Sequence, residues 1–223
     1  MIIPAFNEEN SIQLVIRDLP KDIIREIIVV NNNSNDATSK NAAASGAVVL
    51  NENFQGYGAA CLKGINYISQ KQVKPDIVVF IDADYSDVPE QMSMLVAPII
   101  ENNMDMVIGS RALGKRDHGS MTLPQRFGNR IATTLLRLLY NVSFTDLGPF
   151  RAIRYTSLMQ LDMKDKTYGW TVEMQLKAAK QKFKVTEVAV DYRKRIGFSK
   201  ISGTVKGTFK AGYKIITTIF RYL

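Results

Sequence analysis

The chain has 223 residues, 46% of them hydrophobic and 22% charged, and carries a formal net charge of +8. This length suits one large domain or two small ones and can bury a sizeable core. The positive charge favours anionic partners such as nucleotides, phospholipid surfaces or polyanions, without choosing among them. The single cysteine, Cys61, excludes an internal disulfide, and the single histidine, His118, excludes a multi-histidine metal site.

From the sequence we expect neither a targeting segment nor a membrane-spanning segment. Met1 leads straight into Ile2-Ile3-Pro4 without the basic region of a signal peptide. No apolar stretch approaches the ~20 residues of a spanning helix. A lone cysteine favours a reducing compartment. We therefore expect a cytoplasmic protein, either free or held at the inner face of the cell membrane.

The first half of the chain alternates between strand-like and helix-like segments. Short β-branched runs predict strands at 1–3, 27–30, 48–50, 77–81 and 106–109. The amphipathic or Ala-rich stretches between them predict helices at 9–19, 38–45, 57–70 and 89–102. This repeated alternation predicts a parallel, doubly wound sheet.

The second half is less regular. It shows predicted helices at 125–140 and 170–182, a strand at 185–192, and a loop with room for one short strand at 141–155. The tail 203–223 is basic and amphipathic, with apolar residues interleaved with lysines. Such a tail can lie on an anionic membrane surface or pack as the last helix of the domain, and the sequence leaves both open.

The predicted strand at 77–81 ends in two carboxylates, Asp82 and Asp84, separated by Ala83. Its β-branched and aromatic residues are typical of a strand that is buried on both faces of a parallel sheet. The carboxyl edge of such a sheet is where α/β folds bind their ligands. Carboxylate oxygens suit Mg²⁺ or Mn²⁺ bound to substrate phosphates. The alternative is an ordinary solvated loop, because acidic residues are mostly exposed.

Three further polar loops follow predicted strands and therefore open at the same sheet edge. The first spans 4–9, where Asn7 and Glu8 can bind a base or ribose or merely cap a helix. The second spans 31–38, where we expect a structural role for Asp36 and base recognition near Asn32. The third begins with Gly56-Tyr57-Gly58, which suits either a phosphate cradle or close packing of the backbone.

The order and spacing of these segments resemble inverting family 2 glycosyltransferases with the GT-A fold. The segments that carry the resemblance in the first half are Pro4–Glu8, Asn31–Thr38, Gly56–Ala60, Asp82–Asp84 and Gly109–Arg111.

Three segments of the second half narrow the resemblance to the branch of polyprenyl-phosphate and dolichyl-phosphate sugar synthases. They are Gln125–Arg130, Thr145–Ala152 and Tyr192–Lys200. The resemblance implies a doubly wound, mixed but mostly parallel sheet with helices on both faces. It also implies one domain over 1–223, with a nucleotide-binding half at 1–111, an acceptor-binding half at 112–202 and a C-terminal helix at 203–223.

The resemblance implies roles for individual residues. Asp82 and Asp84 would hold Mg²⁺ or Mn²⁺ on the diphosphate of the donor. The implied catalytic residues are Asp84, Asp146, Arg126 and Lys200. The implied donor-binding and acceptor-binding residues are Pro4, Phe6, Glu8, Val30, Asn32, Asp82, Ala83, Arg111, Asn129, Arg151 and Arg195. Within this set, Arg126 and Asn129 would receive the acceptor phosphate, and Arg195 and Lys200 would close over the diphosphate.

Three residues in two segments depart from the pattern of the family. Asn31 and Asn32 stand where one or two aspartates are usual, so the sequence does not separate uridine from guanosine. Ser86 stands where mannose synthases of this branch often have glutamine near the metal, which leaves a water molecule as a possible third ligand.

The implied activity is transfer of a hexose from a UDP- or GDP-sugar, with inversion, to a polyprenyl phosphate at the membrane surface. A phosphate acceptor is already anionic and needs no strong base, whereas a hydroxyl acceptor would need one, with Asp146 as the candidate. The alternatives are transfer to a hydroxyl on a glycan or a small soluble acid, and a non-catalytic nucleotide-sugar-binding protein. We expect no nucleic-acid partner.

Overall fold

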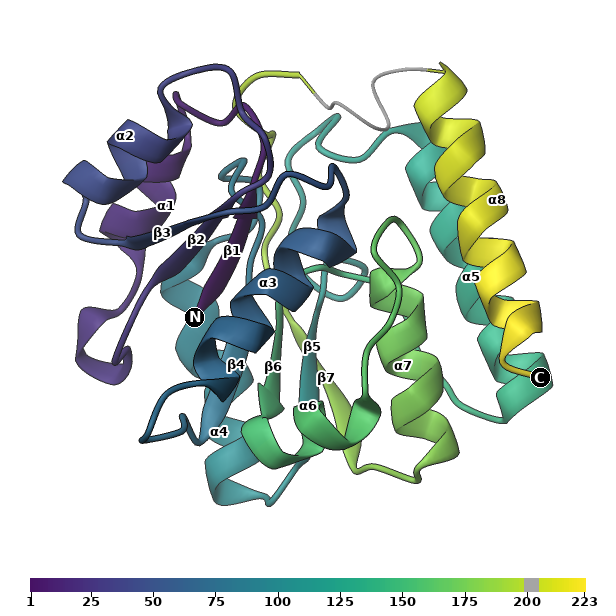
Figure 1. Cartoon of the computed structure of the whole chain (residues 1–223). Coiled ribbons are helices and arrows are strands. Elements are labelled where there is room, and N and C mark those ends of the chain that lie inside the picture. The colour runs from purple at the N-terminus through teal and green to yellow at the C-terminus, as the bar shows by residue number, and fades with distance from the viewer. Residues whose placement is uncertain (199–204) are drawn as a thin grey trace.

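The structure, a computed structural model, describes residues 1–198 and 205–223 and contains a single seven-stranded sheet in the order β3-β2-β1-β4-β6-β5-β7 (Figure 1). The strands are β1 (Ile2–Ala5), β2 (Ile28–Asn31), β3 (Val48–Asn51), β4 (Ile77–Phe80), β5 (Met106–Ser110), β6 (Arg151–Arg154) and β7 (Val185–Ala189). Strand β6 pairs antiparallel with β4 and β5, and the other pairings are parallel. The expected mixed, mostly parallel sheet is confirmed.

Helices cover both faces of the sheet, as expected. The α-helices are α1 (Ile12–Asp18), α2 (Thr38–Ala44), α3 (Tyr57–Ser69), α4 (Met92–Glu101), α5 (Leu123–Tyr140), α6 (Tyr155–Leu161), α7 (Trp170–Lys180) and α8 (Val205–Arg221). Two 3₁₀ turns, η1 (Lys21–Ile23) and η2 (Pro89–Gln91), complete the described elements. Sequence analysis missed α6, because a seven-residue helix shows too little of the 3.6-residue period to be recognised.

Successive residues of each central strand point to opposite faces and build two separate cores. Ile3 packs in a cluster with α1 and α4, whereas its neighbour Ile2 packs in a cluster with α3, α6 and α7. In β4, Val79 belongs to the same cluster as Ile3, and Phe80 belongs to the same cluster as Ile2. A third, smaller cluster joins α5, α7 and α8. Burial on both faces explains why these strands are apolar without alternation.

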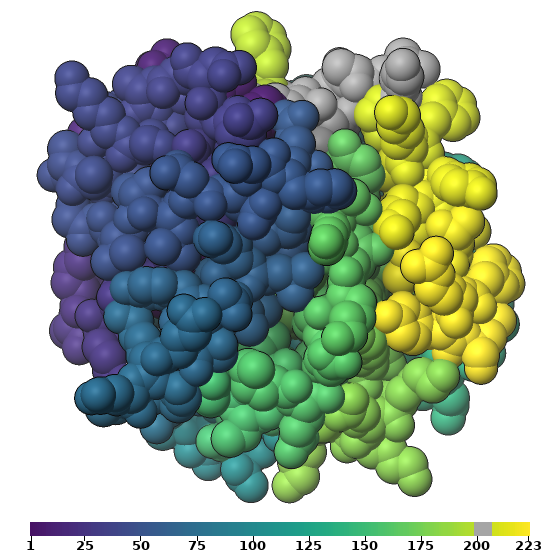
Figure 2. Space-filling model, in the orientation of Figure 1, coloured from purple at the N-terminus to yellow at the C-terminus, as the bar shows by residue number. Residues whose placement is uncertain are grey.

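The C-terminal helix α8 packs beside α5 along the edge of the molecule (Figure 1). Ile219 is fully buried, the Tyr140 hydroxyl donates to its carbonyl at 2.6 Å, and the Tyr222 hydroxyl donates to Glu173 at 2.7 Å. These contacts make α8 the last helix of the domain, one of the two interpretations that the sequence left open. Its outer face lies on the molecular surface (Figure 2). No helix in the described ranges is long and apolar enough to span a bilayer.

The backbone at the start of α3 packs closely against the segment that precedes α7. A Cβ atom on Gly58 would lie 2.0 Å from the carbonyl oxygen of Asp165, and one on Gly56 would lie 2.2 Å from that of Lys166. The amide of Ala59 already donates to Lys166 at 2.9 Å. Close backbone packing therefore explains the two glycines, and this helix start does not form the phosphate cradle considered above.

Candidate functional site at the carboxyl edge of the sheet

Loops from both halves of the chain meet at the carboxyl edge of the parallel strands. The loops after β1, β2, β4 and β5 all leave the sheet there, at the top of Figure 1. Because β6 runs antiparallel, its start lies at the same edge, and this brings Asp146 next to Arg111 after β5. The segment after β7 supplies Arg195. The fold therefore gathers most of the residues that the sequence analysis selected.

Three aspartates, Asp82, Asp84 and Asp87, follow β4 within seven residues. Asp84 is 6% exposed and accepts hydrogen bonds from the amide and the hydroxyl of Ser86. Asp87 is 1% exposed, and among the described residues neither of its carboxylate oxygens has a hydrogen-bond partner; the same holds for Oδ1 of Asp82. Burial and the nearby charge of Asp84 raise the pKa of Asp82 to about 7. Such shielded carboxylate oxygens without donors are suited to a cation.

Sequence analysis passed over Asp87. The only available signal was a third aspartate three residues after Asp84. Its burial is evident only in the folded chain, where Asp87 forms an isolated bridge with Tyr192. Nearby charges, with Asp82 foremost, add to burial in raising the pKa of Asp87 well above its ordinary value.

Arg111 and Asp146 form a shielded, bidentate ion pair. The Nε and Nη2 atoms of Arg111 each lie 2.7 Å from one oxygen of Asp146, and the Arg111 amide donates to the same carboxylate at 2.9 Å. The ring of Tyr192 lies 5.0 Å from the guanidinium. Burial alone would raise the pKa of Asp146, but the charge and hydrogen bonds of Arg111 outweigh it and hold that pKa below its ordinary value. Asp146 is therefore a poor general base here.

Arg195 bridges two carboxylates from distant parts of the chain. Its Nη1 atom lies 3.1 Å from Oδ2 of Asp84, and its Nη2 atom lies 3.0 Å from Oε1 of Glu8. Glu8 also accepts a hydrogen bond from the Ser11 hydroxyl at 2.9 Å. The guanidinium thus lies directly over the expected cation ligand Asp84.

The side chain of Asn32 links the loop after β2 to the loop after β3 by hydrogen bonds. Its amide nitrogen donates to the carbonyls of Glu52 and Phe54 at 3.1 and 2.7 Å, and its oxygen accepts from the amide of Gly56 at 2.7 Å. The three partners fix which end of the amide is nitrogen. An aspartate could not donate to the two carbonyls, which gives a structural reason for asparagine at this position. Asp36 likewise has the structural role expected of it, since it accepts from Glu9 and Thr38.

Two residues expected at the ligand support the loop of Asp146. Asn129 donates to the carbonyl of Thr145 and accepts from the amide of Leu147. Arg151 is fully buried and donates to the carbonyls of Leu147, Gly148 and Thr171. In the structure the backbone of the site occupies the polar groups of both side chains, and their direct contact with a ligand stays a prediction.

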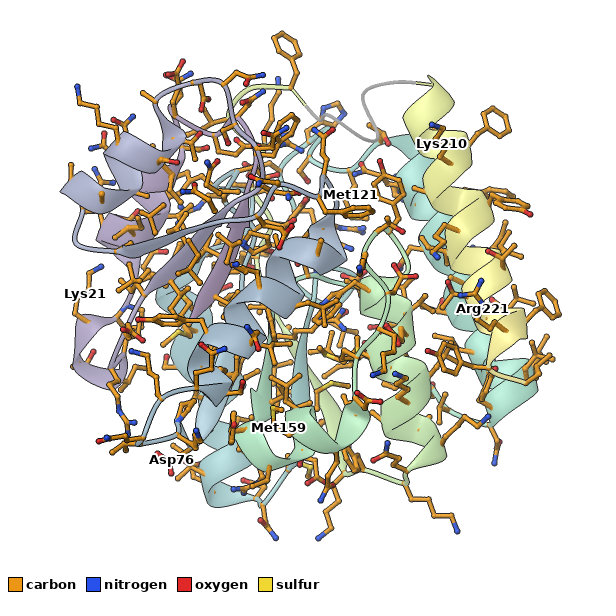
Figure 3. All side chains as sticks on the ribbon, viewed as in Figure 1. Lys21, Asp76, Met121, Met159, Lys210 and Arg221 are labelled. Atoms are coloured by element: carbon orange, nitrogen blue, oxygen red, sulfur yellow. The ribbon has the colours of Figure 1, made fainter. Side chains whose placement is uncertain are left out.

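The remaining expected residues differ in how far they are exposed. Val30 and Ala83 lie in the hydrophobic cores, and Pro4 is buried in β1. Phe6 is half-buried, and Arg126 is exposed on α5. Lys200 lies outside the described residues. Figure 3 places Met121, just ahead of α5, at the upper part of the molecule, and Met159 at the opposite end.

The residues present fit a divalent cation that is shared with a phosphate ligand. Asp82 and Asp84 offer oxygens at a shielded point, and Oδ1 of Asp82 has no donor within the described ranges. No three His, Cys, Asp or Glu side chains in those ranges are grouped to enclose a metal ion by themselves. Mg²⁺ and Mn²⁺ are commonly held by one or two carboxylates together with substrate phosphates, which matches this arrangement.

Comparison with known proteins identifies relatives along nearly the whole chain. The family described as Glycosyl transferase family 2 matches residues 1–162. An uncharacterised glycosyltransferase of Mycobacterium tuberculosis is 32% identical over 95% of this chain and 93% of its own length. An undecaprenyl-phosphate mannosyltransferase of Micrococcus luteus is 28% identical over 92% of this chain and 88% of its own length.

A solved structure shares the fold. Glucosyl-3-phosphoglycerate synthase of M. tuberculosis, crystallised with Mn²⁺, UDP and phosphoglyceric acid, is 20% identical, covers 99% of this chain and 76% of its own, and gives a TM-score of 0.76. At that identity the likeness shows the fold, which is the GT-A fold, and leaves the ligands of this chain to its own site.

We predict that Asn32→Asp destabilises the protein. The substitution removes the donor to Glu52 and Phe54 and places a negative charge beside two carbonyls, a loss of about 1–3 kcal/mol. The melting temperature should fall by several degrees, because each kcal/mol lost lowers it by about 2–4 °C in a chain of this size. Asn35→Asp, at an exposed position of the same loop, serves as the control. Equal melting temperatures for the two variants would contradict the anchoring role of Asn32.

We predict that Asp82→Asn stabilises the protein at pH 8 and has little effect at pH 4. Because the pKa of Asp82 is raised to about 7 in the folded state, the folded protein loses stability as the pH rises from the ordinary carboxyl range through 7. Asparagine removes that loss. Melting temperatures in EDTA across pH 4–8 would measure it, and a stabilisation by Asp82→Asn that is the same at both ends of the range would refute the assignment.

Proposed function

The chain belongs to glycosyl transferase family 2, and from this premise we propose that it transfers a hexosyl group, with inversion, from a UDP- or GDP-sugar to a polyprenyl phosphate at a membrane surface. The donor diphosphate would lie at the carboxyl edge of the sheet. A divalent cation held by Asp82 and Asp84 would supply Lewis-acid stabilisation of the departing diphosphate. The Mn²⁺ and UDP of the related synthase structure support a site of this kind.

The hydrogen bonds and the pKa of Asp146 are the observations that favour one class of acceptor over the other. Transfer to a hydroxyl requires a base to remove its proton, and that base must have a free oxygen and a suitable pKa. Both oxygens of Asp146 bind Arg111, and the pKa of Asp146 is lowered. A phosphate oxygen is already ionised at neutral pH and can attack the sugar without a base. The site therefore favours a phosphate acceptor, for which catalysis is alignment and stabilisation of the leaving group.

The relatives support two kinds of acceptor. The mannosyltransferase of M. luteus carries undecaprenyl phosphate in its name, which agrees with the proposal. The M. tuberculosis synthase was crystallised with phosphoglyceric acid, and this makes transfer to a small soluble acid the second candidate. The two candidates share the donor and differ only in the acceptor.

A matrix of donors and acceptors tests the proposal. UDP- and GDP-hexoses would be incubated with Mg²⁺ or Mn²⁺ and with a polyprenyl phosphate, phosphoglyceric acid or neither, and the release of nucleotide diphosphate measured. We expect the polyprenyl phosphate to raise turnover well above donor hydrolysis, and Asp84→Ala to abolish it while the protein stays folded. Turnover with phosphoglyceric acid alone would favour the second candidate, and no turnover with any donor would favour a non-catalytic binding protein.

A membrane-bound acceptor also needs a way to bring the enzyme to the bilayer, and α8 offers one. The packed helix leaves a stripe of apolar residues exposed at spacings of three or four; the members are Phe209, Tyr213, Ile216 and Phe220. Lys210 and Arg221 lie toward opposite ends of the same helix (Figure 3). Apolar side chains flanked by cations suit the interface of an anionic bilayer.

We predict that the double variant Phe209→Ser/Tyr213→Ser loses binding to vesicles that contain anionic lipid. Each of these side chains is about three-quarters exposed, so the change should leave the fold intact. Val73→Ser/Ile100→Ser removes similarly exposed apolar residues elsewhere and provides the matched control. Co-sedimentation with vesicles would measure the difference. Equal binding by the two double variants would show that α8 does not contact the membrane.

A further inference from the structure

The contact between Arg195 and the cation ligand Asp84 has a chemical consequence. A guanidinium group and a divalent cation both seek carboxylate oxygens, and Arg195 already takes Oδ2 of Asp84 at 3.1 Å. Its other terminal nitrogen holds Glu8 at 3.0 Å, across 187 residues of sequence. One arginine is thus shared between the loop after β1 and the loop after β4.

Backbone hydrogen bonds place Arg195 at this point. The amide of Arg193 donates to the carbonyl of Ser86 at 2.7 Å, and the amide of Ile196 donates to the carbonyl of Asp84 at 3.0 Å. The segment therefore runs directly over the aspartate loop. Release of the Oδ2 atom of Asp84 therefore requires movement of the Arg195 side chain.

One N–H group of the Arg195 guanidinium has no acceptor among the described residues. Its Nε atom is buried and has no hydrogen-bond partner within residues 1–198 and 205–223. A buried N–H without an acceptor is costly, and an anionic oxygen nearby would satisfy it. The side chain of Arg195 can therefore bind a carboxylate and a phosphate oxygen at the same time.

We propose that Arg195 and the divalent cation compete for Asp84, and that Glu8 is the positioning residue that keeps Arg195 at the site when the cation takes Asp84. This inference rests on the proposed function for the presence of the cation and the diphosphate. When both arrive, Arg195 exchanges one carboxylate for the phosphate oxygens and remains tethered to Glu8. Glu8, expected from the sequence to line the base and ribose pocket, thereby acts on the donor through Arg195.

Titration with Mn²⁺ alone tests the competition, because it needs neither donor nor acceptor. Free Mn²⁺ would be followed by electron paramagnetic resonance in the presence of the whole chain. Removing a partly exposed ion pair with Arg195→Gln should tighten Mn²⁺ binding about three- to tenfold. The same variant should weaken the binding of UDP or GDP in saturating Mn²⁺, because the phosphate loses its arginine.

The neighbouring Arg193 provides a matched control. It lies on the same segment and carries the same charge, but it pairs with Glu90 at 3.2 Å. Arg193→Gln should change Mn²⁺ affinity less than twofold. A gain as large as that of Arg195→Gln would mean a general effect of net charge and would overturn the competition. Arg195→Lys, which keeps the charge but loses the two-pronged geometry, replaces Arg195→Gln if the latter does not fold.

A double-mutant comparison tests the role of Glu8. Glu8→Gln should weaken Mn²⁺ binding, because Arg195 then has Asp84 as its remaining carboxylate partner at the site. In the Arg195→Gln background the same change should have no effect. If Glu8→Gln weakens Mn²⁺ binding equally in both backgrounds, Glu8 is a direct cation ligand and the tether is wrong.

The outcomes separate this inference from the proposed function. Unchanged or weaker Mn²⁺ binding by Arg195→Gln, with clear binding by the wild type, overturns the competition and leaves the proposed function in place. If neither protein binds Mn²⁺ up to millimolar concentration, either alone or in the presence of UDP or GDP, Asp84 is not a cation ligand, and the inference and the metal part of the proposed function both fall.

Discussion

An excess of shielded negative charge at the carboxyl edge of the sheet governs the rest of the site. The carboxylates that gather there are Glu8, Asp82, Asp84, Asp87 and Asp146. Carboxylates removed from water are costly unless they are paired. Two arginines answer this requirement: Arg111 neutralises one carboxylate, and Arg195 is shared between two. Two positive charges do not balance five carboxylates, and this excess of negative charge accounts for the affinity for a divalent cation that we propose.

The same constraint divides the carboxylates into two chemical kinds. Asp146, whose two oxygens both accept hydrogen bonds from Arg111, has a lowered pKa, and we propose that it fixes the loop rather than moves a proton. Asp82 has a raised pKa because of burial and the nearby charge of Asp84, and one of its oxygens has no donor in the part of the chain that the structure describes. Environment rather than residue type thus separates a structural carboxylate from a prospective cation ligand. The anionic acceptor that we propose follows from that separation.

Much of the fold could be predicted, because hydrophobic patterning is local. The run at 77–81 and the helices around it have the lengths and periods of a doubly wound sheet, and the structure has them within a few residues. The reversed strand β6 could be placed only as a possible short strand, because its direction depends on pairing with β4 and β5, far away in sequence. The short helix α6 was not predicted, because its seven residues show too little of the helical period of hydrophobic residues.

For the site, the sequence by itself determined which chemical groups arrive at the edge: Asp82 and Asp84 at the end of a buried strand, and an arginine segment after β7. Only the tertiary structure decided how those groups are used. It turned Asn129 and Arg151 toward backbone carbonyls, left Asp87 without a donor among the described residues, and set Arg195 between Glu8 and Asp84. The physical reason is that residue type and strand order are local properties, whereas the pairing of buried charges depends on distances between segments that meet only in the folded chain.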